Sequence, residues 1–185
     1  MFAAVANRSY LYSADALPTA ESIPSPIRCV SEHNWAIPLA HHLLAGRGTQ
    51  IVPSMIWNPR IGIGADYDGG AELLLDLLRV VGEGELDDRE EFDRIVGLTR
   101  GHLDKQRAKH FLLETGEMVS MGGDDVEEAV ASIVEHDIPD SVRRAEAAIA
   151  GGEEAWVASL RAEWGDHFAS FYADHLYFSF PDSSS

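Results

Sequence analysis

Residues 61–81 read IGIGADYDGGAELLLDLLRVV and contain a change from strand-like to helical patterning. Over residues 61–65 apolar side chains alternate with glycine, as in a strand. After the turn at residues 68–70, with Asp68 as the expected helix cap, leucine and valine recur at the spacing of a helix that buries one face. Gly82 and Gly84 are expected to end this helix. The stretch therefore predicts a strand followed directly by an amphipathic helix.

Strand-like patterns dominate before this stretch, and helical patterns dominate after it. Alternating apolar and aromatic residues predict strands over 8–12, 51–57 and 61–65, and a final strand over 176–180. Asn34 is expected to cap a short helix that ends at Gly46. Further helices are expected over 87–103, 124–138, 141–150 and 156–171, with Pro139 ending the second of these. The sequence predicts an α+β fold: a small, mainly antiparallel sheet of N-terminal strands plus a C-terminal strand, packed against four to six helices.

The length of 185 residues and the hydrophobic share of 45% are typical of one soluble domain. We expect a single domain over residues 1–180 and a disordered tail over 181–185. Cys29 is the only cysteine and cannot form an internal disulfide. The N-terminus lacks the basic start and long apolar stretch of a signal peptide, so a cytoplasmic location is expected.

Charge is distributed unevenly along the chain. Residues 1–60 hold four arginines and three acids, whereas residues 61–185 hold 28 acids and ten basic residues, which gives this part a balance of −18. Such a field repels nucleic acid and anionic membranes and attracts cationic proteins. The sequence therefore predicts a cationic protein partner and no nucleic-acid or membrane partner, and it leaves the oligomeric state open.

Two acidic clusters and one tryptophan are the candidate binding residues. Trp35 stands beside polar residues in the weakly charged N-terminal third, which is typical of an exposed anchor in a binding patch. Some of the acids are also expected to act as helix caps. The acids are Asp87, Asp88, Glu90 and Glu91 in the first cluster and Asp124, Asp125, Glu127 and Glu128 in the second.

An alternative reading is a small hydrolase or transferase whose site joins residues 33–42 to residues 66–68. Histidine and aspartate side chains are suited to acid–base chemistry, and strand ends often collect such groups. The residues of this alternative set are His33, His41, His42, Asp66 and Asp68. No complete catalytic, phosphate-binding or metal-binding motif is present, so the sequence predicts neither a cofactor nor a metal.

The stretches ANRSYLYS (residues 6–13), SEHNWAIPLAH (residues 31–41) and DYD (residues 66–68) resemble a group of uncharacterised bacterial proteins that open with an ANRSYLYS-type strand. The resemblance implies a natural start near Ala6 and supplies no catalytic residue. It favours accessory and immunity-type proteins. Together with the charge, it leads us to expect an acidic bacterial protein-binding domain, such as an immunity-like inhibitor of a basic toxin or enzyme.

Overall fold

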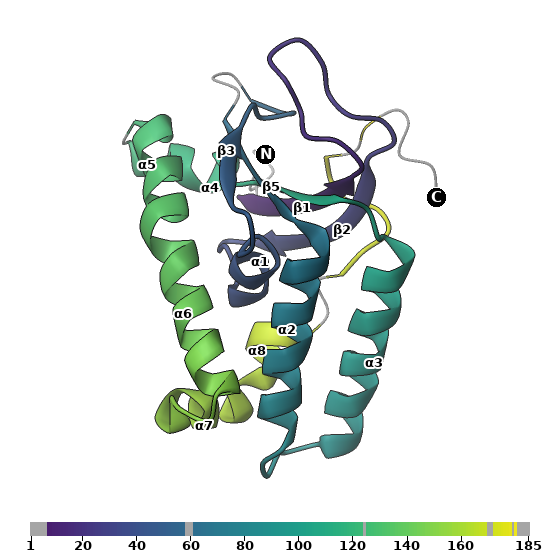
Figure 1. Cartoon of the computed structure of the whole chain (residues 1–185), viewed down its shortest axis with the longest axis vertical. Coiled ribbons are helices and arrows are strands. Elements are labelled where there is room, and N and C mark those ends of the chain that lie inside the picture. Colours follow the sequence, from purple (N-terminus) through teal and green to yellow (C-terminus); the bar gives the residue numbers. More distant parts are fainter. Residues whose placement is uncertain (1–6, 58–60, 124, 170–171, 179, 181–185) are drawn as a thin grey trace, which may run out of the picture.

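The computed structural model describes residues 7–57, 61–123, 125–169, 172–178 and 180. Its strands form one antiparallel sheet in the order β2-β1-β5-β4-β3 (Figure 1). They are β1 (Arg8–Ala14), β2 (Arg28–Asn34), β3 (Gln50–Val52), β4 (Gly62–Asp66) and β5 (His110–Glu114). The sheet and the helices that pack on it confirm the predicted α+β class.

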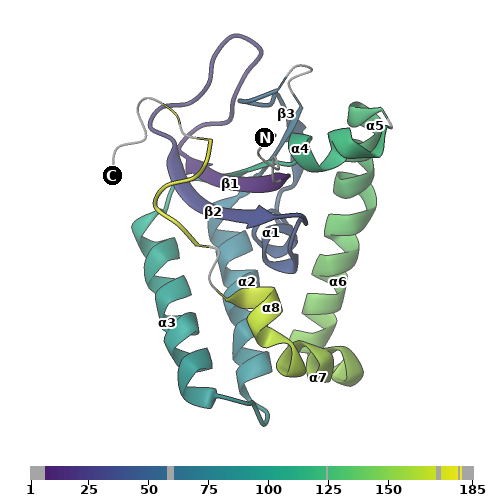
Figure 2. The same cartoon turned by 180° about the vertical axis from the view of Figure 1, so that it is seen from behind.

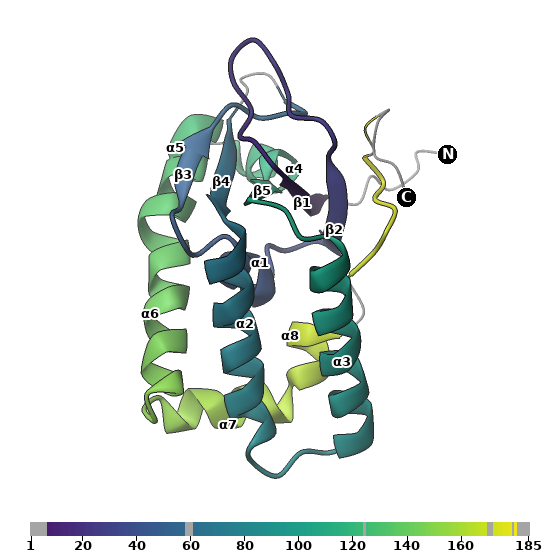
Figure 3. The same ribbon diagram turned by 45° about the vertical axis from the view of Figure 1, so that its right-hand side comes forward.

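The helices fill most of the chain after β4. They are α1 (Leu39–Leu44), α2 (Tyr67–Gly82), α3 (Arg89–Lys105), α4 (Gly116–Val119), α5 (Val126–Ser132), α6 (Ile138–Ile149), α7 (Glu154–Ala162) and α8 (Trp164–Phe168), with a 3₁₀ turn η1 (Ser120–Gly122) and a π turn η2 (Ile133–Asp137). Figure 3 shows α2, α3 and α6 extending away from the sheet, with α7 crossing near their far ends. Within the described residues, no helix is both long and apolar enough to cross a membrane.

One face of the sheet packs on the helices. Leu11 and Leu113 of the sheet belong to the same buried cluster as Leu74 and Leu77 of α2. This matches the apolar spacing that predicts α2, because burying one helical stripe against a sheet removes its apolar surface from water. Helix α1 lies against the first turn of α2 so closely that a Cβ on Gly70 would overlap a backbone carbonyl of α1.

The other face of the sheet is covered by segments without regular structure. Tyr10, Tyr12 and Leu112 point to this face and are buried with Met55 and Leu176. Figure 2 shows the C-terminal segment passing beside β1 and β2. The Tyr12 hydroxyl donates to a backbone carbonyl of this segment, that of residue 178, at 2.6 Å. These contacts bury both faces of β1.

The C-terminal strand expected over residues 176–180 is not part of the sheet; residue 179 lies outside the described residues. The segment instead crosses the face of the sheet opposite the helices, and it meets β2 in an isolated bridge between Tyr172 and Ser31. Its alternating aromatic residues pack against Tyr10 and Tyr12. The same alternation thus serves edge-to-face aromatic packing across the sheet, which the pattern alone does not distinguish from a strand.

Three local expectations are also corrected by the structure. Asn34 does not cap a helix, because it pairs with Arg8 as the last residue of β2, and α1 begins only after Pro38. Asp66, rather than Asp68, caps α2 by accepting from the Gly69 amide at 2.7 Å. The expected strand over 51–57 is confined to β3 at Gln50–Val52, because the following Pro53 cannot donate to a ladder.

The helix after α5 does not end at Pro139. It continues through η2 into α6, and the Ile138 amide donates to the Ile133 carbonyl, five residues earlier. In a regular α-helix a proline ring clashes with the carbonyl four residues back. The wider π turn just before Pro139 gives the ring room, so the chain remains helical up to Ile149.

Candidate functional site

The residues around Trp35 meet a segment from the second half of the chain at a surface pocket. The pocket has a volume of about 620 Å³ and lies between α1, α4, α5 and η2. Figure 2 shows α4 and α5 together above α1, with α6 leading away from them. The pocket is lined by Ile37, His42, Met118, Val119, Glu128, Ala129, Ser132, Ile133 and Asp137.

Trp35 follows β2 directly and precedes the pocket residue Ile37 by two positions in the chain. Its side chain is 59% exposed, and its backbone has a φ of 67°. A left-handed conformation is rare for a large side chain and persists only where the surroundings hold it. Here the Trp35 amide donates to the Asn7 carbonyl at 2.7 Å. The first strand pair thus presents the indole to solvent.

A second exposed apolar side chain is connected to the Trp35 backbone through Asn7. Met121, in the turn after α4, is 61% exposed, and its sulfur contacts the Asn7 side chain, whose backbone holds Trp35. Exposed large apolar groups that gather around a pocket are typical of an interaction surface. We call the surface formed by Trp35, Met121, the pocket and the acids of α5 the Trp35 face.

The rim of the Trp35 face is acidic because α5 begins there. Asp125 caps α5 by accepting from the amides of Glu127 and Glu128 at 2.8 and 3.4 Å. Asp125 therefore has a structural role, while Glu127 and Glu128 are exposed in the first turn. Asp124, the first acid of this cluster, lies outside the described residues. Asp137, at the end of η2, adds a further carboxylate to the pocket.

His42 also lines the pocket, and its imidazole is neutral. Its Nδ1 atom lies 2.9 Å from the Ser141 hydroxyl of α6. Burial lowers the pKa of His42, and the negative charge of Asp137 partly opposes that shift. The imidazole is therefore neutral at neutral pH, and the net charge of the pocket is negative.

His41, the neighbour of His42, has a structural role inside the fold. The Ser9 hydroxyl donates to the Ala36 carbonyl, so His41 Nδ1 donates to Ser9 at 3.1 Å and Nε2 accepts from Ser31 at 2.7 Å. His41 is fully buried, and this burial lowers its pKa to about 3. The neutral ring fastens α1 to β1 and β2, and substrate has no access to it.

The first acidic cluster lies at the far end of the molecule, at the turn between α2 and α3. Asp88 caps α3 by accepting from the Glu91 amide at 3.2 Å, and Glu91 pairs with Arg94. Asp87 lies in a pocket of about 1060 Å³ beside α7, and Glu90 is exposed. Two of these four acids are therefore occupied by contacts within α3.

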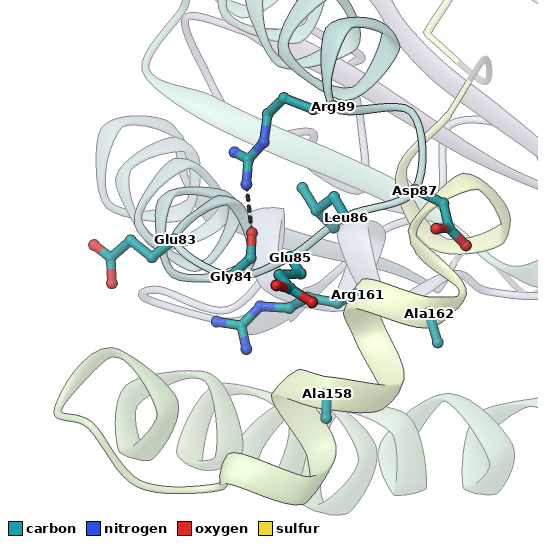
Figure 4. Close-up of a pocket in the computed structure, with 9 residues that line it drawn as sticks. All are labelled: Glu83, Gly84, Glu85, Leu86, Asp87, Arg89, Ala158, Arg161 and Ala162. Carbon is teal, nitrogen blue, oxygen red and sulfur yellow. Dashed lines mark hydrogen bonds between the residues drawn. The ribbon is translucent and has the colours of Figure 1, made fainter.

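Two arginines of that pocket donate to backbone carbonyls at the end of α2 (Figure 4). Arg161 donates to the carbonyls of Val80 and Val81, both at 2.9 Å. Arg89 donates to the carbonyls of Gly82 and Gly84. The last carbonyls of a helix need such partners. This pocket is therefore the packed junction of α2 with α3 and α7.

The alternative set of histidines and aspartates is not brought together. His33 pairs with Ser9 at one end of β1, whereas Asp66 pairs with His110, which pairs with Ala14 at the other end. Five residues of strand separate the two positions along β1, about 17 Å at about 3.4 Å per residue. Asp68 forms an ion pair with Arg107 at 2.9 Å on the α2–α3 side.

The comparisons with known proteins concern the family only. Residues 15–154 match a domain of unknown function, DUF7822. The chain belongs to this family. The DUF7822 region contains every residue that lines the pocket of the Trp35 face, and Trp35 itself. A search of curated proteins and of solved structures finds no match to this chain.

The sequence predicts Trp35, Glu127 and Glu128 as binding residues and His42 as part of the alternative set, but it does not predict the apolar walls of the pocket. Met118 and Val119 belong to a four-residue helix directly after β5, a strand that was not predicted. Only the pairing of β5 between β1 and β4 carries this helix to the Trp35 side of the sheet. No local pattern in the sequence signals that placement.

Proposed function

We propose that this chain is a binding protein for a cationic protein and that the Trp35 face is its contact surface. The observation that carries the proposal is an exposed tryptophan in a left-handed backbone conformation, two residues before Ile37 of a pocket that is lined by both apolar and acidic side chains. In a bacterial cell, an immunity-like inhibitor of a basic toxin or enzyme would have such a surface. The membership of DUF7822 assigns no activity and is compatible with this role.

The two kinds of group at this surface serve different steps of binding. A tryptophan supplies a large rigid contact area and is enriched among residues that dominate binding energy. The carboxylates of α5 and the net charge of −17 accelerate encounter with a positive partner and make it sensitive to salt.

The proposal is tested by affinity capture from the source cell at low salt with the wild-type chain, Trp35→Ala and Leu98→Ala. Leu98 is a matched control because it is 57% exposed on α3, away from the Trp35 face. We expect a basic protein to be captured by the wild type and by Leu98→Ala and released by high salt. For Trp35→Ala we expect binding of that protein to weaken about 30-fold, the effect of losing about 2 kcal/mol at a central anchor.

Two further measurements complete this test. If the captured protein is an enzyme or toxin, adding the wild-type chain should abolish its activity in solution, and Trp35→Ala should not do so at the same concentration. Equal binding by Trp35→Ala and the wild type, with Trp35→Ala folded as judged by its thermal transition, would refute the role of this face.

A further inference from the structure

The surface pockets of this chain differ in whether they contain a cation of the chain itself. The pocket beside α7 contains Arg89 and Arg161, and the groove between α2 and α3 contains three arginines. A pocket between α2 and α6 contains Arg47. The pocket of the Trp35 face contains two carboxylates and, within the described residues, neither arginine nor lysine.

In the other pockets Arg47, Arg79, Arg89, Arg107 and Arg161 are engaged with acids or carbonyls of the chain. Arg107 pairs with Asp68 at 2.9 Å, and Arg47 pairs with Glu146 at 2.6 Å. By contrast, Glu128 and Asp137 have no ion-pair partner in the part of the chain that the structure describes. A positive group from outside the chain could therefore pair with the acids of this pocket, as Arg47 and Arg107 pair with acids in the other pockets.

The walls of the pocket restrict the kind of cation that fits. Met118, Val119 and Ile133 provide apolar surface, while Glu128 of α5 and Asp137 at the end of η2 provide two carboxylates. A ligand must therefore combine an apolar stem with a charged end, as a long basic side chain does. A bare metal ion or a small amine would leave the apolar walls uncovered.

We propose that this pocket accepts an arginine side chain of the cationic partner, a refinement that rests on the proposed function. The stem lies along the apolar walls, and the guanidinium pairs with Glu128 and Asp137. Arginine suits this arrangement better than lysine, because its planar fork offers five donors to two separate carboxylates, whereas an ammonium group is a single point charge. The volume of about 620 Å³ leaves room for the partner backbone at the mouth of the pocket.

The test uses the full chain with ¹³C-labelled methionine methyl groups and a small probe, N-acetyl-L-arginine amide. Met118 lines the pocket, whereas Met55 is buried on the opposite face of the sheet and serves as an internal control. We expect the probe to shift the Met118 methyl signal with saturation at about 1–10 mM, the affinity of a single side chain. The Met55 signal should stay in place. The neutral N-acetyl-L-citrulline amide should leave Met118 unchanged, and N-acetyl-L-lysine amide should bind more weakly.

The second part of the test removes the negative charge of each carboxylate while keeping the shape of its side chain. Glu128→Gln and Asp137→Asn change exposed side chains, and each should weaken binding of the arginine probe about fivefold. Glu90→Gln, at the far end of the molecule, should leave the affinity unchanged. An unchanged Met55 signal in each variant shows that the fold is intact.

Three results would overturn the inference: no Met118 shift with the arginine probe, equal binding of the citrulline or lysine probe, or full affinity in Glu128→Gln and Asp137→Asn. These results are separable from the proposed function. If Trp35→Ala abolishes partner capture but the arginine probe does not bind, the binding face stands and the arginine pocket is refuted. If the probe binds as expected but capture is unaffected by Trp35→Ala, the pocket stands and the proposed function is refuted.

Discussion

Acidification should destabilise this protein through His41. The ring is fully buried between Ser9 and Ser31, where it is neutral and both nitrogen atoms have hydrogen-bond partners. Burial lowers its pKa in the folded state from the ordinary 6.5 to about 3. In the unfolded chain the ring is hydrated and has its ordinary pKa. Between these two values the unfolded chain binds a proton that the folded protein does not.

The sign and size of the effect follow from linkage. Because the unfolded state binds more protons below the ordinary pKa, the free energy of unfolding is highest above pH 6.5 and falls as the pH decreases toward about 3. From about pH 7.5 to about pH 5 this single group removes roughly 2 kcal/mol of stability. That is a large part of the roughly 5–15 kcal/mol by which domains are stable.

The assay compares the wild type with His41→Gln by denaturant unfolding at both pH values. Glutamine keeps a donor and an acceptor for the two serines but does not titrate. We expect the wild type to lose about 2 kcal/mol more than the variant on acidification. The pKa values of His33 and His42 are also lowered, but these residues are present in both proteins and cancel in the comparison. An equal loss in both proteins would refute the assignment of a buried neutral ring.

Two substitution pairs test the local structure. Gly70→Ala should lower the free energy of unfolding by at least about 3 kcal/mol in thermal or denaturant unfolding, because the new Cβ would overlap the Leu44 carbonyl. Gly101→Ala, in the open part of α3, should instead raise the free energy of unfolding by about 0.5–1 kcal/mol. Equal effects of the two substitutions would contradict the close approach of α1 and α2. Asp125→Ala should lower the free energy of unfolding by about 1 kcal/mol, because it removes the cap of α5. Its control Glu90→Ala should change the free energy of unfolding by no more than about 0.5 kcal/mol. An Asp125→Ala variant as stable as the wild type would contradict the role of Asp125 as a cap.

The elements that the sequence predicts correctly are those whose local signals agree with their tertiary role. Helix α2 has an apolar stripe and ends at Gly82, as expected, and α3, expected over 87–103, spans Arg89–Lys105 with Asp88 as its cap. Both helices bury one stripe on a single surface, so the spacing of their apolar residues follows directly from how they pack. Strand β1 is predicted for the same reason, because Tyr10, Leu11 and Tyr12 alternate between two buried faces.

The missed elements depend on pairing partners far away in sequence. Strand β2 contains mostly polar residues, and its residues 28–34 become a strand because they pair with β1. Strand β5 has only five residues and follows a long helix, yet it lies between β1 and β4. Short strands of this kind are determined by the sheet they complete, which local patterns do not encode.

The candidate site shows the same division. The exposure of Trp35 and the acidity of α5 are visible as local features, and the role of Asp125 as a cap agrees with the expected capping residues. Their meeting with Met118 at one pocket depends on the position of β5. The two acidic clusters look equivalent in the sequence, but the tertiary structure gives them different surroundings. One lies at the packed α2–α3 turn, and the other borders a pocket.

This difference limits what the net charge of −17 can do in recognition. The clusters lie at opposite ends of the molecule, with α5 beside the sheet and the α2–α3 turn at the far end of the helices (Figure 1). A charge so distributed attracts a positive partner from every side and accelerates encounter, but it selects no orientation. Orientation requires a place where apolar contact and unpaired carboxylates coincide. Among the described pockets, only that of the Trp35 face combines these groups without an arginine of the chain already occupying it.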